Sequence, residues 1–204
     1  ITGSASDKDK FLKWSETVPF TMRNPLFHWT HLELQRYFGL QDVLNSENGA
    51  VIYDKTTATL QDESFSTQGL LNKMNVEVVC TTDDPSDSLK HHKSYNANTG
   101  GFKMLPGFRP DKYIQIDGKD FLSSIKKLES STNRSIDSLD QLVQGLQDRI
   151  DYFHDNGGRI SDHGLNHIYA AEFTDQEVDK IFREVIGGKE IFAGEAIVFK
   201  SGLL

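Results

Sequence analysis

The pattern of apolar and polar positions changes in the middle of the chain. Before residue 74, apolar residues recur at helical spacing between long polar connections, and after it short apolar runs alternate with amphipathic segments. The change begins in the stretch 76–80, which is rich in β-branched residues and is typical of a buried parallel strand. We therefore expect a buried strand here, in which Cys80 is a small buried hydrophobe rather than a reactive thiol.

The first 73 residues are expected to form a helical subdomain. Ser6 is a candidate N-cap of a first helix, which Pro19 ends or bends. A second helix is predicted over residues 24–39, because Asn-Pro opens it and a glycine suits its end. Further helices are predicted over residues 50–60 and 65–74.

The helix predicted over residues 24–39 raises the question of a metal site. His28 and His31 would lie within reach of each other on a helix, but no third ligand is obvious nearby. A helix surface with aromatic neighbours is therefore favoured for both histidines. The apolar stripe of this helix is expected to consist of Leu26, Trp29, Leu34, Tyr37 and Phe38.

Three strand-then-helix units follow, and they imply an α/β fold with a parallel sheet and right-handed crossovers. After the first strand, we expect exposed surface for the neighbouring His91 and His92, which would point about 100° apart on a helix. The helix over residues 138–156 is expected to place Val143 and Ile150 on its apolar side. The other predicted segments are strands at 102–106 and 159–165, helices at 87–92, 120–128 and 174–186, and loops at 96–101 and 130–134.

Polar residues follow the first of these strands. In folds built from parallel strands and helices, ligands bind at the carboxyl ends of the strands. Thr81, Thr82, Asp83 and Asp84 are therefore candidates to face a ligand. For Asp84, capping of the following helix is the favoured alternative, because Pro85 follows it directly.

The other two strands end in further candidates. Arg109 stands in a loop containing Gly107 and Pro110, where its guanidinium could hold a carboxylate or a phosphate through two hydrogen bonds. A salt bridge to Asp111 is the structural alternative. The pair Asp162–His163 precedes a glycine that permits close approach of a substrate, so a ligand or acid–base role is weighed equally with a structural one.

Composition narrows the range of partners. The 204 residues carry a formal net charge of −8, which disfavours nucleic acid and anionic membranes as partners. The sequence contains 37% apolar residues, no run long enough to span a membrane and no signal peptide, so a cytoplasmic protein is expected. The chain begins with Ile1 and ends in an apolar helix without a cap, which indicates a piece of something longer.

Four stretches, in this order and spacing, resemble bacterial uronate (glucuronate) isomerases. They are Asn24-Pro25-Leu26-Phe27-His28-Trp29-Thr30-His31-Leu32-Glu33-Leu34, Cys80-Thr81-Thr82-Asp83-Asp84-Pro85, Phe108-Arg109-Pro110-Asp111-Lys112 and Ser161-Asp162-His163-Gly164-Leu165. The similarity covers essentially the whole chain. It implies membership of the amidohydrolase-like group of metal-dependent barrels. It also implies an aldose–ketose isomerase of hexuronate catabolism, which interconverts D-glucuronate with D-fructuronate and D-galacturonate with D-tagaturonate.

The resemblance implies that this chain is an internal part of a (β/α)8 TIM-type barrel. Residues 1–73 would be a helical subdomain inserted after the first barrel strand, and residues 74–204 would hold strands two to four with their helices. The family's metal site looks to be built from a His-x-His and an Asp, but the sequence contains no His-x-His. A divalent metal, expected to be zinc, and the main catalytic groups would therefore lie outside this chain, which is expected to bind no metal and to be inactive alone.

Within this family resemblance, the strand-end residues acquire expected roles. Arg109 would hold the carboxylate of a hexuronate substrate, and Thr82 and Asp83 would line the same face. Asp162 and His163 would be catalytic candidates on that face, without assigned steps. The alternative is a self-contained, non-catalytic binding or interaction module that shares ancestry with the isomerase. The open strand edges of an incomplete barrel would also favour self-association of the isolated chain.

Overall fold

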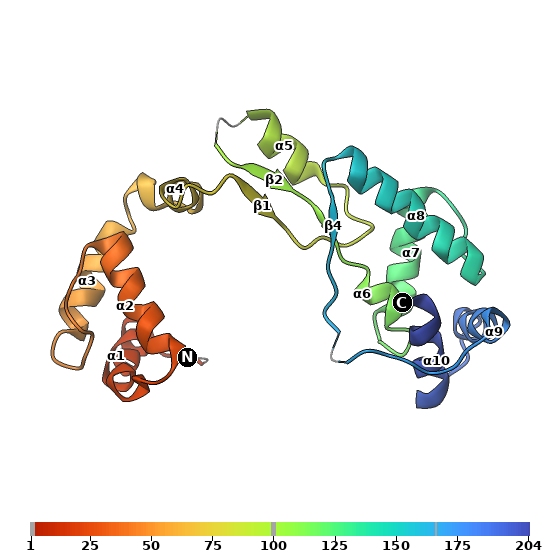
Figure 1. Cartoon of the computed structure of the whole chain (residues 1–204), viewed down its shortest axis with the longest axis horizontal. Helices are drawn as coiled ribbons and strands as arrows, with labels where there is room; N and C mark the ends of the chain where they lie inside the picture. Colours follow the sequence, from red (N-terminus) through yellow and green to blue (C-terminus); the bar gives the residue numbers. More distant parts are fainter. Residues whose placement is uncertain (1–2, 99–100, 166) are drawn as a thin grey trace. The chain divides into compact units, whose positions relative to one another are not determined.

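The computed structural model describes residues 3–98, 101–165 and 167–204, and it divides into two compact units between Val76 and Glu77 (Figure 1). Val76 belongs to the first unit because its N–H donates to the carbonyl oxygen of Leu71 at 3.1 Å. The second unit carries the parallel strands. That the first unit is an insertion after a barrel strand stays a prediction.

Helices make up the regular structure described in the first unit. Ser6 caps the first helix as predicted, since its hydroxyl accepts from the N–H of Asp9, and Pro19 lies in the 3-10 turn that follows this helix. Asn24 caps the second helix, and Gly39 ends it in the left-handed region at φ 68°. The elements are α1 (Asp7–Thr17), η1 (Val18–Thr21), α2 (Pro25–Phe38), α3 (Gly49–Thr59), η2 (Glu63–Phe65) and α4 (Thr67–Lys73).

The inward face of α2 differs from the predicted stripe. Leu26 and Trp29 are 46% and 57% exposed, whereas Phe27, His31, Leu34 and Phe38 face the core, at spacings of four and three residues. The core of this unit contains Val18, Leu34, Leu44 and Ile52, with Phe11, Trp14, Phe27, Phe38 and Leu40 packed against it. The prediction of a surface position is therefore correct for His28 and wrong for His31.

His31 is buried because both of its ring nitrogens are used. The N–H of Leu44 donates to Nε2 at 3.0 Å, so Nδ1 carries the proton and donates to the carbonyl oxygen of Phe27 at 2.6 Å. The ring also packs at 4.4 Å from the ring of Phe27. His31 thus ties the loop before α3 to α2.

The second unit contains the three predicted strand segments, which run parallel to their neighbours. The second segment is divided into β2 and β3. β1 (Val78–Cys80) pairs with β2 (Lys103–Leu105), and β3 (Gly107–Phe108) pairs with β4 (Ile160–Ser161). Pro106 separates β2 from β3 because it has no N–H to donate. The ladder nevertheless continues past it through Thr81, whose N–H donates to Leu105 and whose carbonyl oxygen accepts from Gly107, both at 3.0 Å.

The prediction that the first strand is buried is wrong. Val78 is 45% exposed, Cys80 is exposed, and Ile160 in β4 is 51% exposed. Val78 and Cys80 share one face of the strand, since side chains alternate, while Val79 on the other face is half-buried. Among the described elements, α5 packs against β2 and α8 packs against β3.

The helices of the second unit are α5 (Lys90–Asn98), α6 (Asp111–Ile114), α7 (Phe121–Thr132), α8 (Leu139–Asp155), α9 (Asp175–Ile186) and α10 (Ala193–Leu203). Tyr113, Phe121, Phe182 and Phe199 are among the fully buried side chains of the core that α6, α7, α9 and α10 share. Figure 1 shows α7 and α8 as neighbouring elements that cross each other. No helix within the described residues is both long and apolar enough to cross a bilayer.

The predicted ends of two helices were wrong. The 130–134 loop begins later, because α7 continues to Thr132 and ends where Asn133 adopts φ 54°. The loop expected from residue 96 is helical as far as Asn98, and residues 99–100 lie outside the described part. Asn96 is held there because its amide donates to the carbonyl oxygen of Met104 at 2.7 Å and accepts from the Met104 N–H at 3.1 Å.

The helices predicted over residues 138–156 and 174–186 are confirmed. Ser138 caps α8, and Thr174 forms a capping box with Glu177 at the start of α9. The apolar side of α8 differs in detail, since Val143 and Ile150 are 51% and 43% exposed. Arg149 is buried instead, because backbone carbonyl groups accept its hydrogen bonds.

Candidate functional site

The carboxyl ends of the three strands meet, and their backbones are held in register. The N–H of Arg109 donates to the carbonyl oxygen of Asp83, and the N–H of Asp162 donates to that of Phe108, both at 3.0 Å. A strand-end cavity of about 200 Å³ opens beside the first two ends. It is lined by Thr82, Asp83, Asp84, Arg109, Asp111 and Lys112.

Arg109 lines the strand-end cavity, and its side chain is 37% exposed. Its Nε donates to Asp111 Oδ2 at 2.7 Å, and its Nη1 lies 3.6 Å from Asp162 Oδ2. The hydrogen bond to Asp111 raises the pKa of Arg109. The predicted salt bridge to Asp111 is therefore present. Nη1 and Nη2 make no hydrogen bond to a residue in the described part, so their N–H groups can still donate to a ligand, although Nη1 is also ion-paired with Asp162.

Asp111 connects two of the strand ends. Its Oδ2 accepts from Arg109 Nε and from the N–H of Gly164 at 2.8 Å, and its Oδ1 lies 3.3 Å from His163 Nδ1. Burial raises the pKa of this carboxyl, but the hydrogen bonds from Arg109, Gly164 and His163 outweigh burial, so the pKa lies below its usual value. Asp111 is thus an anionic anchor for the cation beside it.

Gly164 is a glycine for steric reasons. A Cβ at this position would overlap Arg109 Nη2 and would also lie 3.0 Å from Asp111 Oδ2. The prediction that this glycine permits close approach therefore holds for the guanidinium of the same chain. Whether it also does so for a substrate stays a prediction.

Asp83 is committed to its own strand. Its Oδ2 accepts from the hydroxyl of Thr81 at 2.5 Å and lies 3.3 Å from the Gly107 N–H. Its side chain is 14% exposed. Thr82, between these residues, is exposed. Thr82 and Asp83 both line the strand-end cavity, but most of the hydrogen-bonding capacity of Asp83 Oδ2 is already used inside the fold.

His92 joins the hydrogen bonds between Thr81 and Asp83, and the prediction that it is exposed is wrong. The residue is 6% exposed, and its Nε2 lies 2.6 Å from Thr81 Oγ1. Because the Thr81 hydroxyl donates to a carboxylate, Nε2 must carry a proton and donate to that hydroxyl. Its neighbour His91 is exposed, as predicted. Helical spacing alone could not show which of the two faces the sheet.

Asp84 does not cap the following helix, contrary to the favoured prediction. Its Oδ1 accepts from the N–H of Ser86 at 3.0 Å and from the Ser86 hydroxyl at 2.7 Å, and its Oδ2 lies 2.9 Å from Lys112 Nζ. These bonds stabilise a turn, while α5 begins later, at Lys90. Burial raises the pKa of Asp84, but the bonds to Ser86 and Lys112 lower it below its usual value overall. Asp84 therefore stays charged in the wall of the cavity.

The structure thus brings some of the predicted site residues into contact with one another. Arg109 and His163 contact Asp111, which the sequence suggested as a structural partner alone, and Asp162 lies beside Arg109. The alternation of strand residues did not reveal the roles of Lys112 and His92. The described residues contain no group of three or more His, Cys, Asp or Glu side chains able to hold a metal ion, so they do not fit the metal that the resemblance implies.

Comparison with known proteins gives consistent matches along the chain. The family description "Glucuronate isomerase" matches residues 1–204. Among curated relatives, the uronate isomerase of Flavobacterium johnsoniae is 46% identical over 204 residues, which is all of this chain and 44% of that protein. The uronate isomerase of Bacillus velezensis is 42% identical with the same coverage. The chain therefore spans less than half the length of these relatives.

Two solved structures share the fold. The uronate isomerase of Thermotoga maritima matches with a TM-score of 0.91 at 28% identity, over 100% of this chain and 45% of that one. The glucuronate isomerase of Caulobacter crescentus matches with a TM-score of 0.87 at 22% identity, over 97% and 41%. With the parallel strands described above, these matches confirm the prediction of a partial TIM-type barrel.

Proposed function

This chain belongs to the glucuronate isomerase family, and we propose on that premise that it is part of a longer aldose–ketose isomerase. The proposed reactions interconvert D-glucuronate with D-fructuronate and D-galacturonate with D-tagaturonate. Such an enzyme would be an intramolecular oxidoreductase of the amidohydrolase superfamily acting in the cytoplasm. The relatives named uronate isomerase, which match the whole of this chain, support the proposal.

The observation that carries the proposal is the guanidinium of Arg109 at the strand-end cavity. A uronate differs from a neutral sugar by its carboxylate, and arginine can hold that group through two parallel hydrogen bonds. Arg109 Nε is occupied by Asp111, and neither Nη group is hydrogen-bonded to a described residue. We therefore assign the substrate carboxylate to the Nη1 and Nη2 end of Arg109.

The neighbours of Arg109 prepare it for this role. Asp111 holds Nε, and Gly164 leaves the space that Nη2 occupies. A side chain fixed by its own partners loses less conformational entropy when a ligand binds. Asp111 and Gly164 are thus positioning residues for the proposed carboxylate site.

His163 is the neighbour best suited to move a proton. Its Nδ1 faces Asp111 Oδ1 at 3.3 Å, and a carboxylate accepts hydrogen bonds, so Nδ1 carries the proton in the neutral ring. The lone pair of Nε2 then remains as a proton acceptor. Isomerisation of an aldose to a ketose moves a proton between neighbouring carbons, and we propose His163, with Asp162 beside it, as a candidate for assisting that transfer.

A divalent metal, expected to be zinc, remains part of the proposal for the longer enzyme. Because the described residues offer no suitable ligand set, we assign its ligands to residues outside them. The residues of this chain are proposed to bind and orient the substrate.

The complete protein that contains this chain provides the test. Purified from a host that lacks its own uronate isomerase, it should convert D-glucuronate and D-galacturonate to their keto isomers, and a chelator should abolish both conversions. Circular dichroism would establish that the protein is folded. A folded, metal-supplemented protein that converts neither uronate would refute the proposed function.

A further inference from the structure

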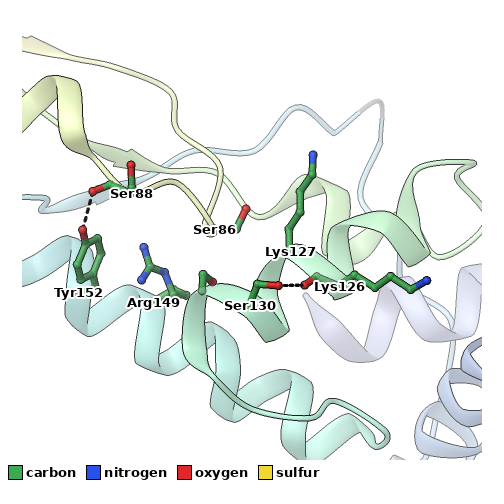
Figure 2. Close-up of a pocket in the computed structure, with 8 residues that line it drawn as sticks. Ser86, Ser88, Lys126, Lys127, Ser130, Arg149 and Tyr152 are labelled. Carbon is green, nitrogen blue, oxygen red and sulfur yellow. Dashed lines mark hydrogen bonds between the residues drawn. The ribbon is translucent and has the colours of Figure 1, made fainter.

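A second cavity, of about 690 Å³, lies in the second unit between α7, α8 and the segment before α5 (Figure 2). We call it the basic cavity, because three of its eight lining residues are cationic and none carries a carboxylate. The lining residues are Ser86, Ser88, Lys126, Lys127, Ser130, Ser131, Arg149 and Tyr152. Such a surface is unexpected in a chain whose formal net charge is −8.

Arg149 is a fixed part of this wall. The residue is 6% exposed, its Nε donates to the carbonyl oxygen of Pro85 at 2.6 Å, and its Nη2 donates to that of Asp87 at 2.7 Å. Its Cζ also lies 3.9 Å from the centroid of the Tyr152 ring, which adds a cation–π contact. Arg149 Nη1 makes no hydrogen bond to a residue in the described ranges, so a rigid, buried cation keeps one donor group unused.

Two exposed cations and a hydroxyl group complete the wall. Lys126 and Lys127 are exposed on α7 and form no ion pair with the residues that the structure describes. In Figure 2, Lys127 rises from α7 beside the cavity, whereas the Lys126 side chain points away from Arg149. The hydroxyl of Ser88 is not hydrogen-bonded within the described residues, unlike that of Ser86, which donates to Asp84. Arg149 Nη1 is therefore a fixed donor available to an anion, and Lys127 and the hydroxyl of Ser88 are further donors in the lining of the cavity.

We propose that the basic cavity binds a phosphorylated small molecule. A phosphate monoester carries close to two negative charges near neutral pH and three strong acceptor oxygens, which suit a lining with three cations, several hydroxyl donors and no carboxylate. The volume of about 690 Å³ falls in the range of pockets that bind organic ligands. It also leaves room for an organic body beside the phosphate. This site does not depend on the proposed isomerase activity.

Isothermal titration calorimetry on the complete protein tests this proposal with glucose 6-phosphate, inorganic phosphate and glucose as probes. Glucose 6-phosphate should bind, inorganic phosphate should bind more weakly, and glucose should not bind. Added salt should weaken both phosphate interactions, because they are between charges. Equal binding of the two phosphate probes would identify the inorganic anion as the ligand of the same site.

Variants locate the binding. Lys127→Gln should weaken glucose 6-phosphate binding by about tenfold, the loss expected for one charged hydrogen bond. Lys126→Gln should have a smaller effect, and Lys119→Gln, an exposed lysine outside the cavity, should have none. The proposal is overturned if no phosphate-bearing probe binds, or if Lys127→Gln and Lys119→Gln bind it equally. Because all three lysines are exposed, these variants should fold as the unmodified protein does.

Discussion

His91 and His92 are neighbours in the sequence but have opposite environments. His92 is buried and donates to Thr81, whose hydroxyl holds Asp83. Its removal leaves Thr81 without this donor and opens space next to the strand end. Replacing His91 and His92 separately therefore tests whether the hydrogen bonds from His92 to Thr81 and from Thr81 to Asp83 stabilise the fold.

We expect His92→Ala to lower the free energy of unfolding by roughly 1 to 3 kcal/mol, the cost of losing a buried hydrogen-bond partner. His91→Ala, at the exposed neighbour, should change it by less than about 0.5 kcal/mol. Urea denaturation of both variants measures the difference. Equal, small effects would mean that the contact with Thr81 contributes little.

Asp111 makes a prediction about pH. Its pKa in the folded chain lies below the usual carboxyl value, so the charged Asp111 carboxylate adds to the free energy of unfolding. This contribution is fully present above the unfolded pKa of about 4, and it is lost as the pH falls through the folded pKa. Asp111→Asn should be less stable near neutral pH, and its unfolding free energy should fall less steeply in acid. Urea denaturation between neutral and acid pH provides the measurement. Parallel pH curves for the two proteins would show that Asp111 is not stabilised as its partners imply.

The sequence located the strand-end residues but not their partners. Arg109, Asp162 and His163 were found because they follow apolar strand runs, and the structure places Arg109 and His163 on Asp111 and Asp162 beside Arg109. The buried state of His92 and His31 was missed. Each makes a hydrogen bond with a residue 11 or 13 positions away, and helical periodicity does not encode such contacts.

At the scale of elements, the residues that begin helices were predicted more reliably from the sequence than the burial of strands. Ser6 and Asn24 open their helices as predicted, and Ser138 and Thr174 cap theirs in the same way, because each cap is a contact between residues two or three positions apart. Burial of the first strand was predicted wrongly. Whether Val78 is covered depends on segments distant in the sequence, and no local pattern reports it.

The capping box of α9 allows this view of the elements to be tested. Thr174→Ala removes the side-chain acceptor for the Glu177 N–H and should cost about 1 kcal/mol of unfolding free energy. Ser123→Ala is the control, because Ser123 is exposed within α7 and its hydroxyl bonds to a carbonyl oxygen of the same helix. Thermal unfolding of the two variants should separate them. A cost for Ser123→Ala as large as for Thr174→Ala would contradict the capping argument.

At the scale of the whole molecule, the strands have an uncovered apolar face. Val78 and Ile160 are about half exposed, and the chain spans 44% of the length of its relatives. We propose that other segments of the longer protein cover this face, as in a closed barrel.

The isolated 204-residue chain is therefore expected to self-associate through its strands. Light scattering over a range of concentrations should show a mass that rises with concentration. Val78→Lys together with Ile160→Lys should reduce the association, because charge on an open strand face opposes pairing. A chain that stays a monomer at high concentration would argue that its exposed strand faces do not attract each other.

The most direct test of the proposed function is to measure kcat/KM after replacing Arg109, the residue to which we assign the substrate carboxylate. In the complete protein, Arg109→Met should lower kcat/KM for D-glucuronate by roughly 100-fold, because the charged pair with the substrate is lost, and Arg109→Lys should lower it less. Arg183→Met is the control, since Arg183 lies exposed on α9 and pairs with Asp179, and it should leave kcat/KM unchanged. A value for Arg109→Met close to that of the unmodified enzyme would contradict the assignment and leave Arg109 as a structural partner of Asp111.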